Sequence, residues 1–183
     1  MLKPHSITVI AGLSGVGKTY VIERMLANDE RFVHFSAGSL IKKRLAVVDR
    51  DHLRLFSANQ ILQNQYALVE QFNIEMESVP KGIHVLFDAH MIIDIGTEVI
   101  EIPFDIFEKL APSRMILLCE DPEIIVQRRN SDSSRDRPTR SVIEIQKQQG
   151  LSQKLAAELS EHLSIPLLTC SPQDVSELKA YIV

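Results

Sequence analysis

The chain has 183 residues, of which 45% are hydrophobic, and its formal net charge at pH 7 is -4. This length fits one domain with an ordinary core, and the acidic balance argues against nucleic acid as a partner. No apolar run approaches the ~20 residues of a membrane-spanning helix, and the first residues lack the cleavage site of a signal peptide. We therefore expect a cytoplasmic protein that is not inserted in a membrane.

A glycine-rich motif follows the first expected strand. The apolar run at residues 6–12 leads into "GLSGVGKT", which opens a helix-length stretch that reaches about residue 28. Glycines let backbone N–H groups turn inward around a polyphosphate, and the helix directs its positive end at the same anion. In this pattern Lys18 reaches the β- and γ-phosphates, and the Thr19 hydroxyl completes a Mg²⁺ coordination sphere. The motif predicts a site for a nucleoside triphosphate, formed by Gly12, Leu13, Ser14, Gly15, Val16, Gly17, Lys18, Thr19 and Tyr20.

The third expected strand ends in polar residues. A second strand is expected at 31–36, followed by helical patterns at about 38–47 and 51–79 and then by the third strand at 82–90. Asp88 follows a mostly apolar run, so it is a candidate to hold Mg²⁺, directly or through water; alternatively, it caps the next turn. His90 either points into the same cleft or is a structural hydrogen-bonding residue. The stretch 91–104 is a β-ribbon or a loop that packs against the preceding helix. We expect it to be exposed, which makes it a candidate contact in a homo-oligomer.

Five arginines lie close together after the fourth strand, which is expected at 114–120. Asp121 and Pro122 predict the start of a helix there. The polar segment that follows contains Arg128, Arg129, Arg135, Arg137 and Arg140. Because a guanidinium can bind two phosphate oxygens at once, this segment predicts a lid that neutralises a phosphoryl group and excludes water. The alternative is a solvated loop in which the arginines pair with Asp132 and Asp136.

A last helix at about 141–163 and a strand at 165–170 complete an alternation of strands and helices. This alternation predicts an α/β fold with a five-stranded parallel sheet and helices on both faces. The two cysteines, Cys119 and Cys170, each end an apolar run, so we expect both to be reduced thiols.

Several motifs, taken in chain order, resemble one family. They are "GLSGVGKT", "FSAGSLIKKR", "DRDHLR", "VLFDAH", "DPEIIVQRR", "SRDR" and "IEIQKQQ". Together they resemble the adenylate kinase and nucleoside monophosphate kinase group of P-loop proteins, above all the short-lid archaeal-type adenylate kinases. The resemblance implies a single P-loop kinase domain over residues 1–183, with an acceptor-binding helical region at about 36–80 and a lid at about 129–140. It further implies transfer of a phosphoryl group from Mg-ATP to AMP, which yields two ADP.

The resemblance assigns an acceptor site. Ser36, Gly38 and Lys42 fall in the stretch that holds the acceptor nucleotide in the family, with Lys42 in place of an arginine. Arg54 is a second candidate for the acceptor phosphate, and we count His90 with this group.

The resemblance also assigns the donor site and the charge stabilisation. Arg128 falls where the family packs an arginine on the ATP adenine. Arg135 and Arg137 fall on the lid arginines, which would act on the migrating phosphoryl group together with Lys18 and Arg128.

The stretch 91–104 departs from the family pattern, since it keeps only Gly96 and Pro103 of it and offers no arginine. This departure leaves two further hypotheses open. In one, the acceptor is the hydroxyl of a small molecule or of a nucleic-acid end, and Asp88 acts as the base. In the other, the chain is an ATP-dependent switch or ATPase whose state a partner reads.

Overall fold

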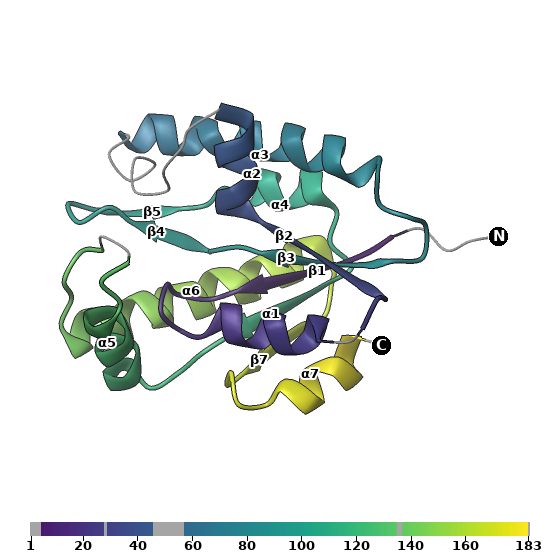
Figure 1. Ribbon diagram of the computed structural model, residues 1–183. Coiled ribbons are helices and arrows are strands. Elements are labelled where there is room, and N and C mark those ends of the chain that lie inside the picture. Colours follow the sequence, from purple (N-terminus) through teal and green to yellow (C-terminus); the bar gives the residue numbers. More distant parts are fainter. Residues whose placement is uncertain (1–4, 28, 46–56, 135–136, 183) are drawn as a thin grey trace.

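Five parallel strands form the central sheet (Figure 1). The computed structural model of the chain describes residues 5–27, 29–45, 57–134 and 137–182. In space the strands follow the order β2-β3-β1-β6-β7. They are β1 (Ser6–Ala11), β2 (Phe32–Ser36), β3 (His84–Asp88), β6 (Arg114–Leu118) and β7 (Leu167–Cys170). The predicted five-stranded parallel sheet is confirmed.

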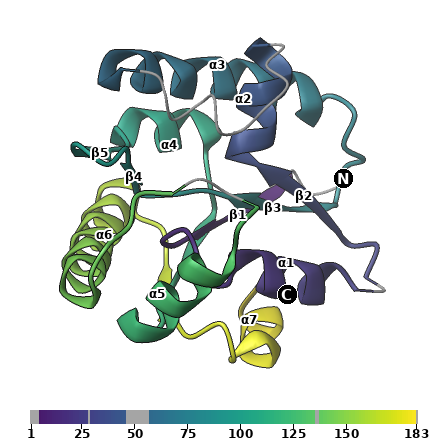
Figure 2. The same ribbon diagram turned by 60° about the vertical axis from the view of Figure 1, so that its left-hand side comes forward.

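Helices cover both faces of this sheet, as the sequence predicts. Five of them lie where the sequence places them: α1 (Lys18–Leu26), α2 (Ala37–Leu45), α3 (Ala58–Met76), α5 (Pro122–Ser131) and α6 (Val142–Leu163). Helices α2 and α3 lie over one face and α1 over the other (Figure 2). The Asp121 side chain caps α5 by accepting the amide of Glu123 at 2.8 Å. Ser57 and Ser141 start α3 and α6 with capping boxes, which satisfy otherwise orphaned amides.

Two helices were not predicted, and a hairpin was predicted only as one of two alternatives. The helices are α4 (Phe104–Leu110) and α7 (Val175–Ile182), and the hairpin consists of β4 (Ile92–Asp94) and β5 (Val99–Glu101). The hairpin confirms the β-ribbon alternative for residues 91–104. Its apolar side chains are buried within this chain, so the expectation that this stretch is exposed is wrong for them: Met91, Ile92, Ile100 and Ile102.

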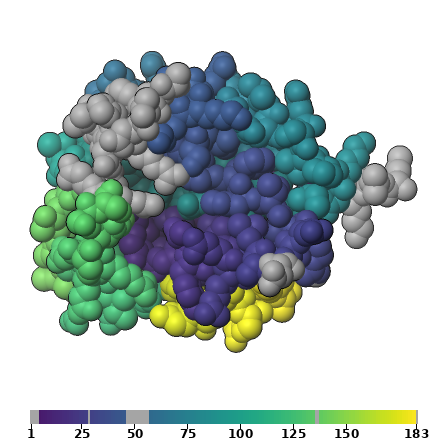
Figure 3. All heavy atoms as spheres, in the orientation of Figure 1, coloured from purple at the N-terminus to yellow at the C-terminus, as the bar shows by residue number. Residues whose placement is uncertain are grey.

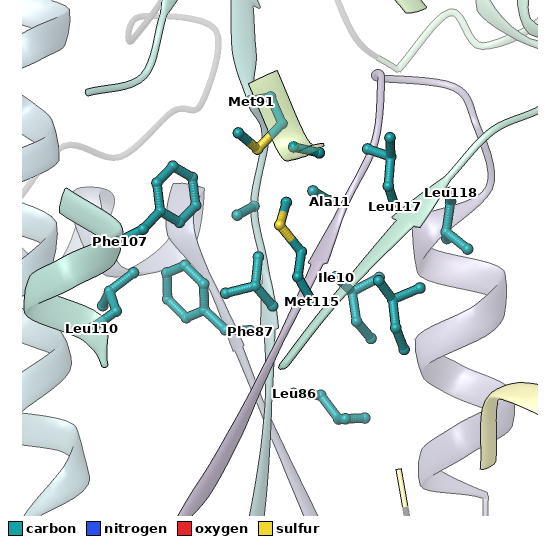
Figure 4. Packing of buried hydrophobic residues seen from close by; sticks show 14 of the residues in the cluster. Ile10, Ala11, Leu86, Phe87, Met91, Phe107, Leu110, Met115, Leu117 and Leu118 are labelled. Carbon is teal, nitrogen blue, oxygen red and sulfur yellow. The ribbon is translucent and has the colours of Figure 1, made fainter. Parts of the chain in front are cut away.

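The core lies on both sides of the sheet (Figure 4). The Phe72 ring of α3 packs edge-on against Phe35 and Phe87, with centroid distances of 5.8 and 5.4 Å. Strand β1 is fully buried from Val9 to Ala11 and delivers the chain to Gly12 at the carboxyl edge of the sheet. The site described below is therefore built on a rigid, buried strand.

Two sequence expectations concern the whole chain. None of the described helices has both the length and the hydropathy needed to span a bilayer. Cys119 and Cys170 are half-buried free thiols, and burial raises the pKa of Cys170 to about 11.

A half-buried histidine makes stability depend on pH. Burial, with a smaller contribution from Arg114, lowers the pKa of His84 from 6.5 to about 4. Its Nε2 lies 2.7 Å from Thr8 Oγ1. Above pH 6.5 this histidine is neutral in both the folded and the unfolded state. Below pH 6.5 it becomes protonated in the unfolded chain, whereas in the folded chain it stays neutral until about pH 4. We therefore expect the free energy of unfolding to fall as the pH falls from 6.5 to 4.

Urea unfolding across this range measures the effect. His84→Gln should flatten the dependence, whereas His162→Gln, which changes an exposed histidine of α6, should keep it. An equal slope in wild type and His84→Gln would contradict the assignment.

Candidate active site

The glycine-rich loop has the backbone of a phosphate cradle. Gly12 and Gly17 have φ angles of 154° and 116°, which L side chains rarely adopt. A Cβ at Gly12 would also lie only 2.8 Å from the Leu118 carbonyl oxygen, so a larger residue cannot replace it without a shift of the backbone. Helix α1 starts at Lys18, directly after Gly17, and its first amides therefore face the loop.

Lys18 lies inside this loop. Its side chain is only 8% exposed, and its Nζ donates to the carbonyls of Gly12 at 2.7 Å and Leu13 at 3.2 Å. The same ammonium lies 4.0 Å from Asp88 Oδ1. A phosphate entering the loop would meet this compact cation at its centre.

Asp88 and His90 reach the loop from the neighbouring strand. Strand β3 pairs with β1 so that Asp88 stands opposite Ile10, two residues before Gly12. The Asp88 Oδ1 atom is buried, and no described residue donates a hydrogen bond to it. His90 Nδ1 lies 2.9 Å from the Gly12 carbonyl oxygen, which can only accept, and 3.3 Å from Lys18 Nζ, which can only donate. We assign the proton to this ring nitrogen because the contact with the carbonyl is the shorter of the two. His90 thus supports the loop and also lines the cavity described below.

Arginines of α5 and the following segment converge on the loop, and the green α5 lies beside the purple amino-terminal residues in Figure 3. Arg128 donates to the Val16 carbonyl at 2.8 Å and to Glu120 at 3.1 Å. Arg129 donates to the Ser14 carbonyl at 2.8 Å. Part of the predicted cluster of guanidinium groups therefore forms at the P-loop, whereas Arg140 pairs with Asp94 instead and Arg135 lies outside the described residues.

Arg137 is the most buried of these arginines. It is 7% exposed, and it donates to Ser14 Oγ at 3.0 Å and to Asp132 at 2.6 Å. Its Nη1 is buried, and no acceptor among the described residues contacts it. Hydrogen bonds from Ser134 and Arg137 lower the pKa of Asp132 to about 2, so this carboxylate stays ionised. The alternative of a self-paired loop holds for the pair of Arg137 and Asp132, but this pair lies against the P-loop rather than in solvent.

These residues border one cavity of about 540 Å³. The P-loop, Arg128 and Arg137 form one end, and the other end lies between α3, α4 and the hairpin. The apolar side chains of this second end include Ile61, Leu68, Ile93, Ile102, Ile106 and Phe107.

Three of the predicted acceptor-binding residues line this cavity: Ser36, Gly38 and His90. Lys42 is half-buried on α2 and does not line it, and Arg54 lies outside the described residues. Thr19 and Asp88, the predicted metal-binding residues, both line it.

Sequence reasoning missed Gln65, which is 6% exposed and lines the apolar end. A polar residue one turn from Ile61 and one from Leu68, on the buried face of a helix, is the signal that could have found it.

Comparison with known proteins supports one family. Residues 11–146 match the model of an AAA domain. The adenylate kinase of Thermoplasma acidophilum is 30% identical over 84% of this chain and 82% of its own length. The adenylate kinase of Pyrobaculum aerophilum is 32% identical over 77% of this chain and 72% of its own length. In fold, the chain is similar to the crystal structure of TT1252 from Thermus thermophilus, with a TM-score of 0.59, 14% identity and coverage of 98% and 97% of the two chains. The chain therefore belongs to the adenylate kinase-like nucleoside monophosphate kinases, a family of P-loop proteins.

Proposed function

We propose that the protein transfers the γ-phosphoryl group of Mg-ATP to a nucleoside monophosphate, and that AMP is the preferred acceptor. The observation that carries this proposal is one cavity that has a cationic P-loop at one end and an apolar end between α3 and α4. The first end suits phosphates and the second suits a base. The adenylate kinases among the relatives support AMP as the acceptor.

Phosphoryl transfer depends mainly on positioning the two substrates and on neutralising the charge of the phosphoryl group. Lys18, Arg128 and Arg137 supply positive charge where the phosphoryl group moves, and we keep Arg135 as a predicted fourth. An oxygen of the acceptor phosphate is the nucleophile, so no general base is required. Arg128 is also our candidate for the contact with the donor base.

The residues present fit a magnesium ion. The buried Asp88 carboxylate oxygen and the Thr19 hydroxyl border the same part of the cavity, and Mg²⁺ prefers such oxygen ligands while it keeps several waters. When bound, the ion would neutralise negative charge on the phosphates. Thr19 and Asp88 would hold it, Asp88 directly or through water.

We propose that the acceptor lies in the region of about 36–80 and that residues of about 129–140 cover the phosphates. Ser36, Gly38 and His90 border the acceptor end and support this division. Lys42 and Arg54 remain predicted ligands of the acceptor phosphate.

A coupled assay that follows ADP, run with ATP and each of several nucleoside monophosphates, tests the proposal. We expect rapid ADP formation with AMP and slower formation with the others. A slow ATPase that no monophosphate accelerates would overturn the proposal.

Gln65 is expected to select the acceptor base. Its Nε2 donates to the Ile61 carbonyl at 3.4 Å, which leaves Oε1 as the end of the amide available to a ligand. An exposed acceptor oxygen favours a base with an amino group over one with a carbonyl at the same position. We expect wild type to prefer AMP over inosine monophosphate, whose base has a carbonyl in place of the amino group and a proton on the neighbouring ring nitrogen, by about 100-fold in kcat/KM. Gln65→Leu should remove most of this preference by lowering kcat/KM for AMP.

Gln71→Leu is the matched control, because Gln71 lies on the same helix, is also 6% exposed and bonds Glu75 away from the cavity. It should leave the preference in place. Equal use of the two monophosphates by wild type would contradict the role of Gln65.

A further inference from the structure

Arg140 does not join the arginines at the P-loop. Its Nε and Nη2 donate to the two carboxylate oxygens of Asp94 at 2.9 and 2.8 Å, and Nη2 also donates to the Gly96 carbonyl at 2.7 Å. Asp94 further accepts the Gln148 side-chain amide at 2.7 Å and the Gly96 backbone amide at 2.9 Å. The two side chains are only 18% and 10% exposed. Such a bidentate, shielded pair has a fixed geometry, unlike an ordinary surface ion pair.

The pair is ionised at neutral pH. Burial alone would raise the pKa of Asp94, but the hydrogen bonds from Arg140 and Gln148 outweigh it and lower the pKa to about 2. The charge of this carboxylate is therefore constant over the range in which the enzyme would be assayed.

The pair joins two parts of the site. Asp94 ends β4, and its neighbour Ile93 lines the apolar end of the large cavity. Arg140 stands just before Ser141, the N-cap of α6, and three residues after Arg137. Arg137 itself lines the phosphate end of the same cavity.

The backbone between the two arginines is tightly held. Pro138 fixes one φ angle there, and its Cγ would lie 3.6 Å from a Cβ at Gly96, so the hairpin turn packs close to this segment. Asp94, Gln148, Pro138 and Arg137 all line a second, smaller cavity of about 70 Å³. Arg140 is bonded to the hairpin, and Arg137, three residues earlier, is bonded to Ser14.

We propose that Asp94 and Arg140 are positioning residues for phosphoryl transfer, which hold Arg137 against the P-loop by tying its segment to the β4–β5 hairpin. This inference rests on the proposed function. It gives Arg140 a role within the protein rather than on the phosphates. It also means that the β4–β5 hairpin, which borders the acceptor end, and Arg137, which faces the phosphates, move together as one rigid unit.

The test measures kcat and both KM values of R140Q and D94N. Since a misplacement of about 1 Å can cost up to about 100-fold, we expect each variant to lower kcat by about tenfold with little change in the KM for ATP or AMP. The effect should vanish when Arg137 is already altered, because the pair acts through that residue. R140Q introduced into R137K should therefore leave kcat at the value of R137K alone.

R31Q is the matched control, since Arg31 also makes a bidentate pair, with Asp29 at 2.8 Å from both Nε and Nη2, but far from the cavity. It should leave kcat unchanged. An unchanged kcat in folded R140Q and D94N, or full additivity of R140Q with R137K, would overturn the proposal. If one variant fails to fold, the other provides the same measurement.

The outcome is separable from the proposed function. If wild type phosphorylates no monophosphate, the proposed function fails, and amide hydrogen exchange of residues 137–148 with ATP bound then tests the anchor alone. Faster exchange in R140Q than in wild type would support it, and equal exchange would overturn it.

Discussion

Replacing Lys18 by methionine is expected to lower kcat by about 10²–10³-fold, the usual result when a group that stabilises transition-state charge is removed. Methionine keeps the length and the apolar stem of the side chain but removes the ammonium, which lies buried among the carbonyls of Gly12 and Leu13. No other lysine lines the cavity in the described part of the chain, so no second ammonium can take its place. The coupled assay at saturating ATP and AMP measures the loss.

Lys154→Met is the control for this substitution. Lys154 is 69% exposed on α6 and makes only a weak pair with Glu158 at 3.8 Å, so its replacement should leave kcat unchanged. A Lys18→Met protein that stays folded and keeps most of its kcat would contradict the assigned role of Lys18.

Replacing Arg137 by glutamine is expected to lower kcat by about 10³-fold, as the loss of an arginine that stabilises a migrating phosphoryl group does. The buried Nη1 has no acceptor among the described residues, and a phosphoryl oxygen at the P-loop would provide one. Arg137→Lys should recover only part of the loss, because an ammonium keeps the charge without the planar fork. The affinity for ATP, measured by calorimetry, should change little.

A different pattern would contradict this role. If Arg137→Gln weakens ATP binding as much as it lowers kcat/KM and leaves kcat intact, Arg137 binds the ground state of the donor instead. Arg137→Lys then separates charge from geometry, since a simple ground-state charge contact would be restored by lysine.

The sheet and the donor end of the site could be predicted from the sequence because their signals are local. Buried parallel strands are short apolar runs, and the cradle needs glycines at Gly12 and Gly17 with Lys18 and Thr19 directly after them. Asp88 could be identified for the same reason, as the polar residue that ends a buried strand.

The short helix α4 could not be predicted. It has only seven residues after Pro103, too few for a helical period to emerge. Its position is decided by packing: Ile106, Phe107 and Leu110 are buried in the core.

The destination of Arg140 could not be predicted either. The sequence groups it with four other arginines, but the structure pairs it with Asp94, 46 residues earlier in the chain. These residues come together only because the β4–β5 hairpin packs against the start of α6. Similarly, the helical pattern of α2 says that Lys42 is on a helix, but the contacts between α2 and α3 decide whether it faces the cavity.

The Gly12 carbonyl oxygen takes part in two hydrogen bonds, and this has a consequence for turnover. It accepts hydrogen bonds both from Lys18 and from the imidazole of His90. When Lys18 turns to bind a phosphate, this oxygen keeps its hydrogen bond from the imidazole. The movement of the lysine therefore does not leave the Gly12 carbonyl without a hydrogen bond. The loop can thus keep one shape while substrates come and go, and little of the binding energy is consumed in reshaping it.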